Sequence, residues 1–282
     1  MPPLERGPVY QAPMNDTLRM AKRVRGRIIR ALHAAGGGHF GGSLSVVDIL
    51  VAIYSLVARS GLDWDDPARD RIVLSKGHAA IALYAILAEL NRIDPSLLPR
   101  YGTFNSGLEG HPDMLITPGV DFSSGSLGQG LAVGIGMALA LADSDTHTWV
   151  VLGDGECQEG QVWESAMIAA RYRLRNLTVI VDANGAQETG FTSRPELNQE
   201  PIPDMLSKWQ AFGWNAGLVN GHDIPALTEA FLHPHKQKEA PSVWIALTRK
   251  GAGVPFFEED SPRYHCTELS ENEFKRALEL IR

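Results

Sequence analysis

The sequence predicts an α/β protein built on a doubly wound, mainly parallel sheet with helices on both faces. Two apolar, β-branched runs, residues 147–152 and 177–182, have the length and composition of strands that are buried on both faces. Between them, from Gln161, apolar residues recur with a period of about 3.6, which indicates an amphipathic helix. This alternation of strand and helix continues along the chain and is typical of parallel sheets.

The remaining elements follow in chain order. Residues 1–13 carry four prolines and are expected to form an extended arm, which leaves residues 14–282 as one domain. Residues 14–35 predict a helix whose Arg and Lys side chains form a solvated face. Further strands are expected at 71–75, 214–219 and 242–247, polar loops at 185–205 and 249–266, and a last amphipathic helix at 271–281.

Composition limits the classes of function. The chain has 282 residues, of which 44% are hydrophobic, so it can bury a large core. Its net charge of −7 argues against a nucleic-acid partner, which would need a basic face. No apolar run approaching the roughly 20 residues of a membrane span and no signal pattern stand out, so we expect no membrane partner and a cytoplasmic location. The two cysteines, Cys157 and Cys266, are expected to be reduced thiols.

Polar residues follow both strands of the first strand–helix–strand unit. Asp154 comes directly after one strand and Asn184 after the next. Because parallel strands end at the same edge of a sheet, these oxygens should lie close together, where a small hard cation could add phosphate and water ligands. Gly153 and Gly155 allow the backbone to approach a phosphate. A Gly-Asp-Gly turn alone is common, but the whole combination predicts a metal and diphosphate site.

The segment GDG…QEG…NLTVIVDANG, residues 153–185, resembles the thiamine diphosphate motif of transketolases, and the resemblance extends over residues 14–282. Four more segments match in the family's order. They are GGGHFGGSLSVVDILVAIY (36–54), in the form typical of two-subunit transketolases and deoxyxylulose phosphate synthases, LSKGHAA (74–80), LEGHPD (108–113) and GSLGQGLAVGIGMALA (125–140).

The resemblance implies thiamine diphosphate and Mg²⁺, or Ca²⁺ or Mn²⁺, as cofactors. It assigns the metal to Asp154, Asn184 and the carbonyl of Ala186. An apolar Leu127 beside the cofactor could equally be ordinary core. The residues it implies for cofactor binding are His78, Gly125, Ser126, Leu127, Gly153, Asp154, Gly155, Glu156, Asn184 and His265.

Histidines supply the expected proton chemistry, because ketol transfer moves protons on sugar hydroxyls near neutral pH. His39, His78 and His111 lie beside glycine or proline in predicted loops. Each alone could be making loop hydrogen bonds, but as a set at the motif positions they are expected to line a substrate channel. His265 joins them by resemblance, although Cys266 replaces the glycine that often follows it.

Glu159 matches an acidic residue near the family's subunit contact, where linked carboxylates are thought to pass protons; alternatively it is a carboxylate that stabilises a helix N-terminus. The other histidines are expected to be structural or solvated. They are His33, His147, His222, His233 and His235.

Thiamine catalysis also needs a carboxylate on the aminopyrimidine ring, because the cofactor carries out the chemistry and the protein positions it. By resemblance this carboxylate belongs to a second domain, for which this chain has no candidate. We therefore expect a separate partner chain of similar size with the pyrimidine-binding domain, in an α2β2 assembly that acts on sugars or sugar phosphates.

The sequence thus predicts the diphosphate-binding subunit of a heteromeric transketolase, which transfers a two-carbon ketol group from a ketose or ketose phosphate to an aldose. One alternative is the α subunit of a 2-oxoacid dehydrogenase or another thiamine-dependent lyase, whose usual loops lack these histidines. Another is a non-catalytic, cofactor-binding regulatory subunit. Pentose phosphates, branched sugars, sulfosugars and secondary-metabolism intermediates all remain open as substrates.

Overall fold

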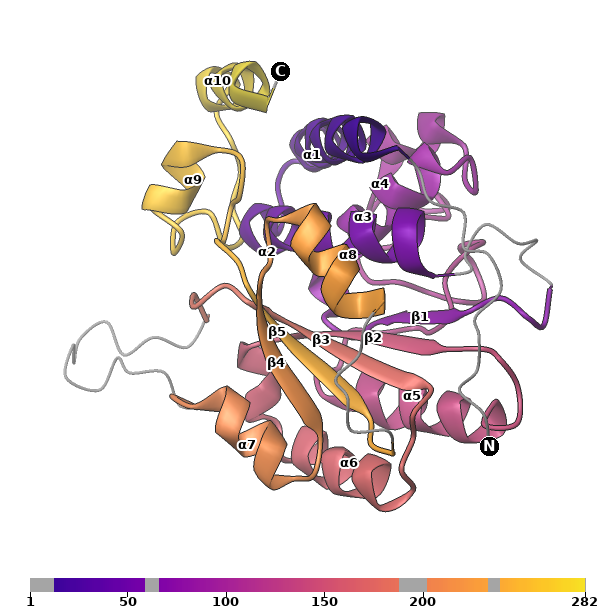
Figure 1. Ribbon diagram of the computed structural model, residues 1–282. Coiled ribbons are helices and arrows are strands. Elements are labelled where there is room, and N and C mark those ends of the chain that lie inside the picture. Colours follow the sequence, from indigo (N-terminus) through magenta and orange to yellow (C-terminus); the bar gives the residue numbers. More distant parts are fainter. Residues whose placement is uncertain (1–12, 59–65, 188–201, 233–238, 282) are drawn as a thin grey trace.

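A five-stranded parallel sheet forms the centre of the molecule (Figure 1). The computed structural model describes residues 13–58, 66–187, 202–232 and 239–281. The strand order is β1-β2-β3-β5-β4, and all five predicted strands are confirmed. The strands are β1 (Arg71–Leu74), β2 (Thr148–Gly153), β3 (Leu177–Ala183), β4 (Asn215–Asn220) and β5 (Ser242–Leu247).

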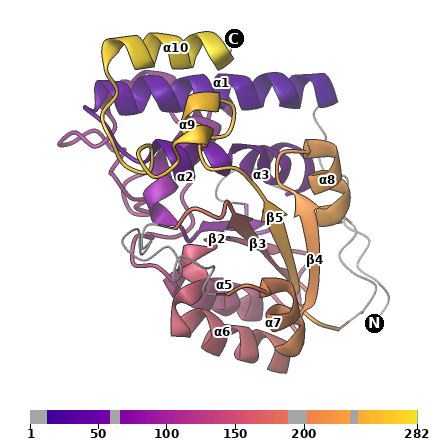
Figure 2. The ribbon, with the colours of Figure 1, turned by 90° about the vertical axis from the view of Figure 1, so that its left-hand side faces the viewer.

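Helices cover both faces of the sheet, which confirms the doubly wound architecture (Figures 1 and 2). A separate apolar core fills the space on each side of the strands. One layer contains α1 (Met14–Ala34), α2 (Phe40–Ser45), α3 (Val47–Ala52), α4 (Ala80–Glu89), α8 (Ile224–Leu232), α9 (Pro255–Glu259) and α10 (Glu271–Ile281). The other contains α5 (Gln129–Ala140), α6 (Gly160–Arg171) and α7 (Met205–Ala211).

Short helical pieces connect these elements. A π-helical turn, η1 (Ile53–Val57), continues α3, and 3-10 turns form η2 (Gly77–Ala79), η3 (Pro95–Arg100) and η4 (Gly155–Gln158). Two of these turns, η2 and η4, begin within a few residues of a strand end. They turn the chain at the carboxyl edge of the sheet, where ligands of open parallel sheets bind.

The register of β2 and β3 explains why their following turns lie side by side. Gly153 pairs with Asp182, so both strands end at the same level. The amide of Asp154 donates to the carbonyl of Asp182 at 3.3 Å and extends the ladder by one bond. The chain therefore brings Asp154 and Asn184 to the same edge.

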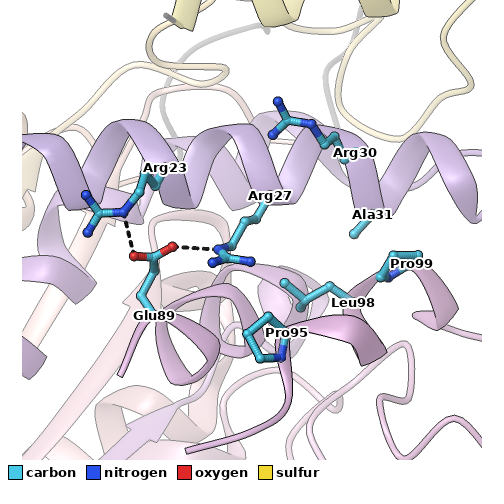
Figure 3. A pocket seen from close by; sticks show the side chains of 8 residues that line it. All are labelled: Arg23, Arg27, Arg30, Ala31, Glu89, Pro95, Leu98 and Pro99. Atoms are coloured by element: carbon cyan, nitrogen blue, oxygen red, sulfur yellow. Dashed lines mark hydrogen bonds and ion pairs between the residues drawn. The ribbon is translucent and has the colours of Figure 1, made fainter. Parts of the chain in front are cut away.

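The prediction that the basic residues of the first helix form a solvated face is wrong for Arg25, whereas most of the others are exposed. Arg25 is 9% exposed and pairs with the buried Asp48 of α3. Arg23 and Arg27 both hold Glu89 of α4, with N–O distances of 2.7 and 2.6 Å (Figure 3). Asp48 holds Arg25 in a buried position, while Arg23 and Arg27 reach Glu89 from the exposed and half-buried parts of the helix, and the helix period alone gives no sign of these acidic partners.

Two further expectations need correction. The predicted loop 249–266 contains α9, which starts with Pro255 and buries Phe257 against Phe40 of α2. The stretch Phe40–Val57 is long and apolar enough to cross a membrane, contrary to the expectation that no run approaches that length, and all of it is buried inside the fold. The expected arm 1–13 lies, except for Pro13, outside the described residues, so the division of the chain stays a prediction.

Candidate active site

A cavity of about 230 Å³ opens at the carboxyl edge of the sheet, between the turns after β1, β2, β3 and β5. It brings together most of the predicted site residues, from segments far apart in the sequence. These are His39, His78, Gly125, Leu127, Gly153, Asp154, Gly155, Glu156, Asn184, Ala186 and His265, and they are joined by Gly42, Lys76, Gln187 and Lys250, which sequence reasoning missed.

A second cavity, of about 300 Å³, lies between α1, α4 and η3 (Figure 3). Arginines, prolines and the doubly paired Glu89 line it, and none of the predicted site residues reaches it. The cavity at the sheet edge is therefore the candidate active site.

The expected metal ligands lie on the floor of this cavity. Asp154 is 5% exposed, and its carboxylate accepts hydrogen bonds from the amides of Gly155 (2.8 Å) and Gly185 (2.7 Å). Burial raises the pKa of Asp154, and the nearby charge of Asp182 raises it further. Both effects would be relieved by a cation beside the carboxylate.

Asn184 shapes the turn that presents the third expected ligand. Its Oδ1 accepts from the amide of Ala186 at 3.1 Å, which closes a turn around Gly185 (φ +67°). Within the described ranges no cluster of three or more His, Cys, Asp or Glu side chains could hold a metal. One carboxylate, one amide and one carbonyl form an oxygen set for a hard cation that also takes phosphate and water.

Lys250 lies directly on that third ligand. Its ammonium donates to the carbonyl of Ala186 at 2.5 Å and contacts Nδ1 of His265. The Ala186 carbonyl thus already attracts a positive charge, which fits a cation or a cationic side chain facing a diphosphate. The signal for Lys250 was available, because β5 ends at the same sheet edge and Lys250 follows it by three residues.

A second lysine is fully buried below the cavity. Lys76 is 1% exposed, and its ammonium lies 2.5 Å from Oδ2 of Asp182 and 3.0 Å from the carbonyl of Gly42. Burial alone would raise the pKa of Asp182, but Lys76 and the hydroxyls of Ser45 and Thr248 outweigh it and hold the pKa below its ordinary value. Lys76 thus connects the turn after β1 to α2, through Gly42, and to β3, through Asp182.

Three of the four predicted histidines form one cluster. The ring centroid of His39 lies 5.4 Å from that of His78 and 5.7 Å from that of His265. The rings of His78 and His265 are 6.4 Å apart. Burial lowers the pKa of His78 to about 2, and Lys76, His39, His265 and Lys250 add to the effect. His78 is therefore neutral at ordinary pH and can both donate and accept a hydrogen bond.

An antiparallel bridge between Gly38 and Thr267 holds the loops of His39 and His265 together, with N–O distances of 2.9 and 3.1 Å. Cys266, between His265 and Thr267 in the chain, is exposed. The replacement of glycine by Cys266 therefore leaves His265 facing the cavity.

Glu156 connects two loops of the cavity wall. It is 2% exposed and accepts hydrogen bonds from the Ser75 hydroxyl (2.5 Å), the Gly128 amide (2.9 Å) and the Gly153 amide (3.0 Å). Burial raises the pKa of Glu156 against these bonds. Both carboxylate oxygens thus accept hydrogen bonds from the protein, and Glu156 lines the cavity as a residue that holds its wall together.

His111, Ser126 and Glu159 are exposed and do not line the cavity. His111 lies beside it, since a Cβ on Gly125 (φ +156°) would meet the His111 ring at 3.2 Å. Glu159 precedes the first turn of α6 and makes no side-chain capping hydrogen bond there.

Three other histidines have structural partners. His33 stacks on Phe274, with ring centroids 3.9 Å apart, and buried His147 bonds the Thr178 hydroxyl at 2.8 Å. Nδ1 of His222 lies 2.8 Å from the carboxylate of the buried Asp48, whereas His233 and His235 lie outside the described residues.

Comparison with known proteins connects this geometry to a family. Residues 17–280 match the family described as transketolase, thiamine diphosphate binding domain. The chain is 37% identical over 268 residues to the 6-deoxy-6-sulfo-D-fructose transketolase subunit of Clostridium sp. (strain MSTE9), covering 93% of this chain and 95% of the relative. It is also 37% identical over 277 residues to an apulose-4-phosphate transketolase subunit of Actinobacillus succinogenes, covering 97% and 98%.

Longer relatives match over part of their length. Transketolase-like protein 2 of Mus musculus is 37% identical over 275 residues, which are 95% of this chain and 43% of that protein. The transketolase structure from Campylobacter jejuni superposes with a TM-score of 0.82 at 30% identity, covering 96% of this chain and 43% of that one. The chain belongs to the transketolase family and corresponds to its thiamine diphosphate binding domain.

Proposed function

We propose that the chain is the diphosphate- and metal-binding subunit of a two-chain transketolase, which transfers a two-carbon ketol group from a ketose or ketose phosphate to an aldose. The observation that carries this proposal is the shared cavity. The oxygen set of Asp154, Asn184 and the Ala186 carbonyl lies in the same cavity as the cluster of His39, His78 and His265.

The residues present fit thiamine diphosphate with a divalent cation. Asp154, Asn184 and the Ala186 carbonyl would hold Mg²⁺, with Ca²⁺ or Mn²⁺ as substitutes. Lys250 and His265 would face the diphosphate, and the glycines at 153 and 155 leave room for it. When bound, thiamine diphosphate supplies the stabilised carbanion that ketol transfer requires.

The histidine cluster would handle the substrate's hydroxyls. Neutral His78 can donate one hydrogen bond and accept another, so it can orient a hydroxyl without adding charge. His39 and His265 contact it and each other through their rings, so a proton that leaves a hydroxyl has a neighbouring imidazole to receive it. His111 at the edge would contact the distal part of a sugar.

A partner chain with the pyrimidine-binding domain would complete the site, in an α2β2 assembly in the cytoplasm. Coverage supports a separate partner chain: this chain spans 95% and 98% of relatives that are named as subunits, but 43% of mouse transketolase-like protein 2. The net charge of −7 argues against a nucleic-acid partner.

The alternatives have less support. A 2-oxoacid dehydrogenase α subunit would share the metal ligands, but the histidine cluster and the family match favour transketolase. A regulatory subunit without catalysis would have no reason to keep the complete oxygen set beside three histidines.

Asp154→Ala tests the metal assignment in the assembled complex. We expect this variant to lose Mg²⁺-dependent binding of thiamine diphosphate, measured by calorimetric titration with and without the metal. Asp94→Ala is the matched control, because Asp94 is an exposed carboxylate that accepts a backbone amide at η3. Undiminished affinity in Asp154→Ala would reject the metal site.

A further inference from the structure

A buried charged network lies behind the cavity without lining it. Arg25 of α1 donates to both carboxylate oxygens of Asp48 of α3, at 3.0 and 2.6 Å. Nδ1 of His222, in the turn between β4 and α8, lies 2.8 Å from Oδ2 of the same carboxylate. Burial alone would raise the pKa of Asp48, but His222 and Arg25 outweigh it and hold the pKa below its ordinary value.

The hydrogen bonds of His222 define its tautomer. The amide of Arg249 donates to Nε2 of His222 at 2.8 Å, so Nε2 carries no proton. The ring proton is therefore on Nδ1, where it donates to Asp48. In this neutral form the imidazole connects the buried carboxylate of Asp48 to the backbone amide of Arg249 through one hydrogen bond on each side.

That amide belongs to the segment that carries Lys250. The segment is held on both sides of the lysine: the Arg249 amide bonds His222, the Gly251 amide donates to the Gly41 carbonyl at 3.0 Å, and the Ala252 carbonyl accepts from Nε of Arg25 at 3.0 Å. Arg25 and His222 thus both bond Asp48, and each also makes a hydrogen bond to the backbone next to Lys250.

The segment needs such anchors. Gly251 and Gly253 have φ values of +82° and +93°, so the chain here passes through conformations that side-chain-bearing residues rarely adopt. The long Lys250 side chain loses rotamer freedom when its ammonium is held on the Ala186 carbonyl. A backbone fixed directly before and after the lysine limits where that ammonium can lie.

We infer that His222 is a positioning residue, which acts through the Arg249 amide to fix the backbone that carries Lys250 and so sets the affinity of the site for the cofactor diphosphate. This inference rests on the proposed function, in which Lys250 faces the diphosphate. Asp48 keeps both bonds from Arg25 without His222, so the distinctive contribution of the imidazole is its acceptor for Arg249.

Two substitutions separate the hydrogen bond that His222 makes to Asp48 from the one that it accepts from Arg249. His222→Asn places an amide near the Nδ1 position, so it can still donate to Asp48 but offers no acceptor to Arg249. His222→Gln reaches the Nε2 position and restores an acceptor for the Arg249 amide. We expect His222→Asn to weaken thiamine diphosphate binding by the complex about tenfold, the equivalent of one hydrogen bond, with kcat at saturating cofactor nearly unchanged.

Hydrogen exchange reports on the bond between the Arg249 amide and His222 without cofactor or partner. Amides 249–253 of the free chain should exchange about tenfold faster in His222→Asn, and His222→Gln should recover most of the protection. In the unaltered chain, the ring ¹⁵N shifts of His222 should show the proton on Nδ1. A proton on Nε2 would overturn the inference whether or not any variant folds.

Lys250→Met distinguishes failure of this inference from failure of the proposed function. We expect it to weaken cofactor binding, and His222→Asn to add no further loss in the Lys250→Met background, because both act through the same ammonium. Unchanged affinity in Lys250→Met would refute the role of Lys250 in the proposed site. A loss in Lys250→Met with none in His222→Asn, or with full additivity in the double variant, would refute the role of His222.

Discussion

Two glycines of α5 test how tightly this helix packs on the sheet. Gly134 and Gly136 are both interior residues of the helix, but they face opposite environments. A Cβ on Gly134 would lie 2.4 Å from Cγ2 of Val150 in β2, whereas a Cβ on Gly136 would meet nothing within 4 Å. Replacing each by alanine therefore compares the same chemical change with and without overlap.

Both variants gain the same helix preference, worth about 1 kcal/mol for alanine over glycine. Val150 is fully buried on a central strand, and its β-branched side chain has few rotamers to move into. Such overpacking costs about 1–3 kcal/mol. We expect Gly136→Ala to raise the free energy of unfolding by up to about 1 kcal/mol, and Gly134→Ala to leave it unchanged or lower it by up to about 2 kcal/mol.

Urea denaturation followed by circular dichroism measures the difference between the two variants directly, with the denaturant slope as a check on two-state unfolding. The packing account would be refuted if Gly134→Ala were as stable as Gly136→Ala. Because α5 follows the loop that lines the cavity, Gly134→Ala should also weaken cofactor binding, whereas Gly136→Ala should not.

Three further predictions follow. His39→Ala and His78→Ala should each lower ketol transfer by about 10²- to 10⁴-fold without loss of fold, and wild-type turnover in both would remove them from the catalytic set. Lys76→Met should cost about 3–5 kcal/mol in urea denaturation, because it leaves the Asp182 charge buried without its partner, and a loss below 1 kcal/mol would contradict that pairing. The free energy of unfolding should fall as the pH drops below about 6.5, because His78 takes up a proton in the unfolded chain but not in the fold. It should fall further below about 4, because Asp48 and Asp182 take up protons in the unfolded chain while their lowered pKa values keep them ionised in the fold. A flat profile from pH 7 to 3 would contradict these pKa directions.

The elements of this fold could be predicted because their signals are local. The apolar strands 147–152 and 177–182 and the helix between them differ from the observed β2, β3 and α6 by few residues. The edge that carries Asp154 and Asn184 follows from strand direction alone. Loop glycines and histidines could be placed by resemblance, because the family's motifs keep their order.

The missed features depend on long-range partners. Lys76 is buried because Asp182 lies beside it, 106 positions further along the chain, and Arg25 is buried because of Asp48 and the Ala252 carbonyl. A periodic pattern shows which face of an element is apolar, but not which charge will find a buried partner. Lys250 differs from these two, because it follows the predicted strand 242–247 by three residues and its place at the carboxyl edge could be expected from strand direction.

Affinity purification of the tagged chain from its native host, with mass spectrometry of whatever co-elutes, tests the central claim most directly. The account predicts a stoichiometric partner chain that carries a pyrimidine-binding domain, and ketol transfer by the pair in the presence of thiamine diphosphate and Mg²⁺. Recovery of this chain alone under the same conditions, with both cofactors added, would contradict the two-chain transketolase and favour a regulatory subunit.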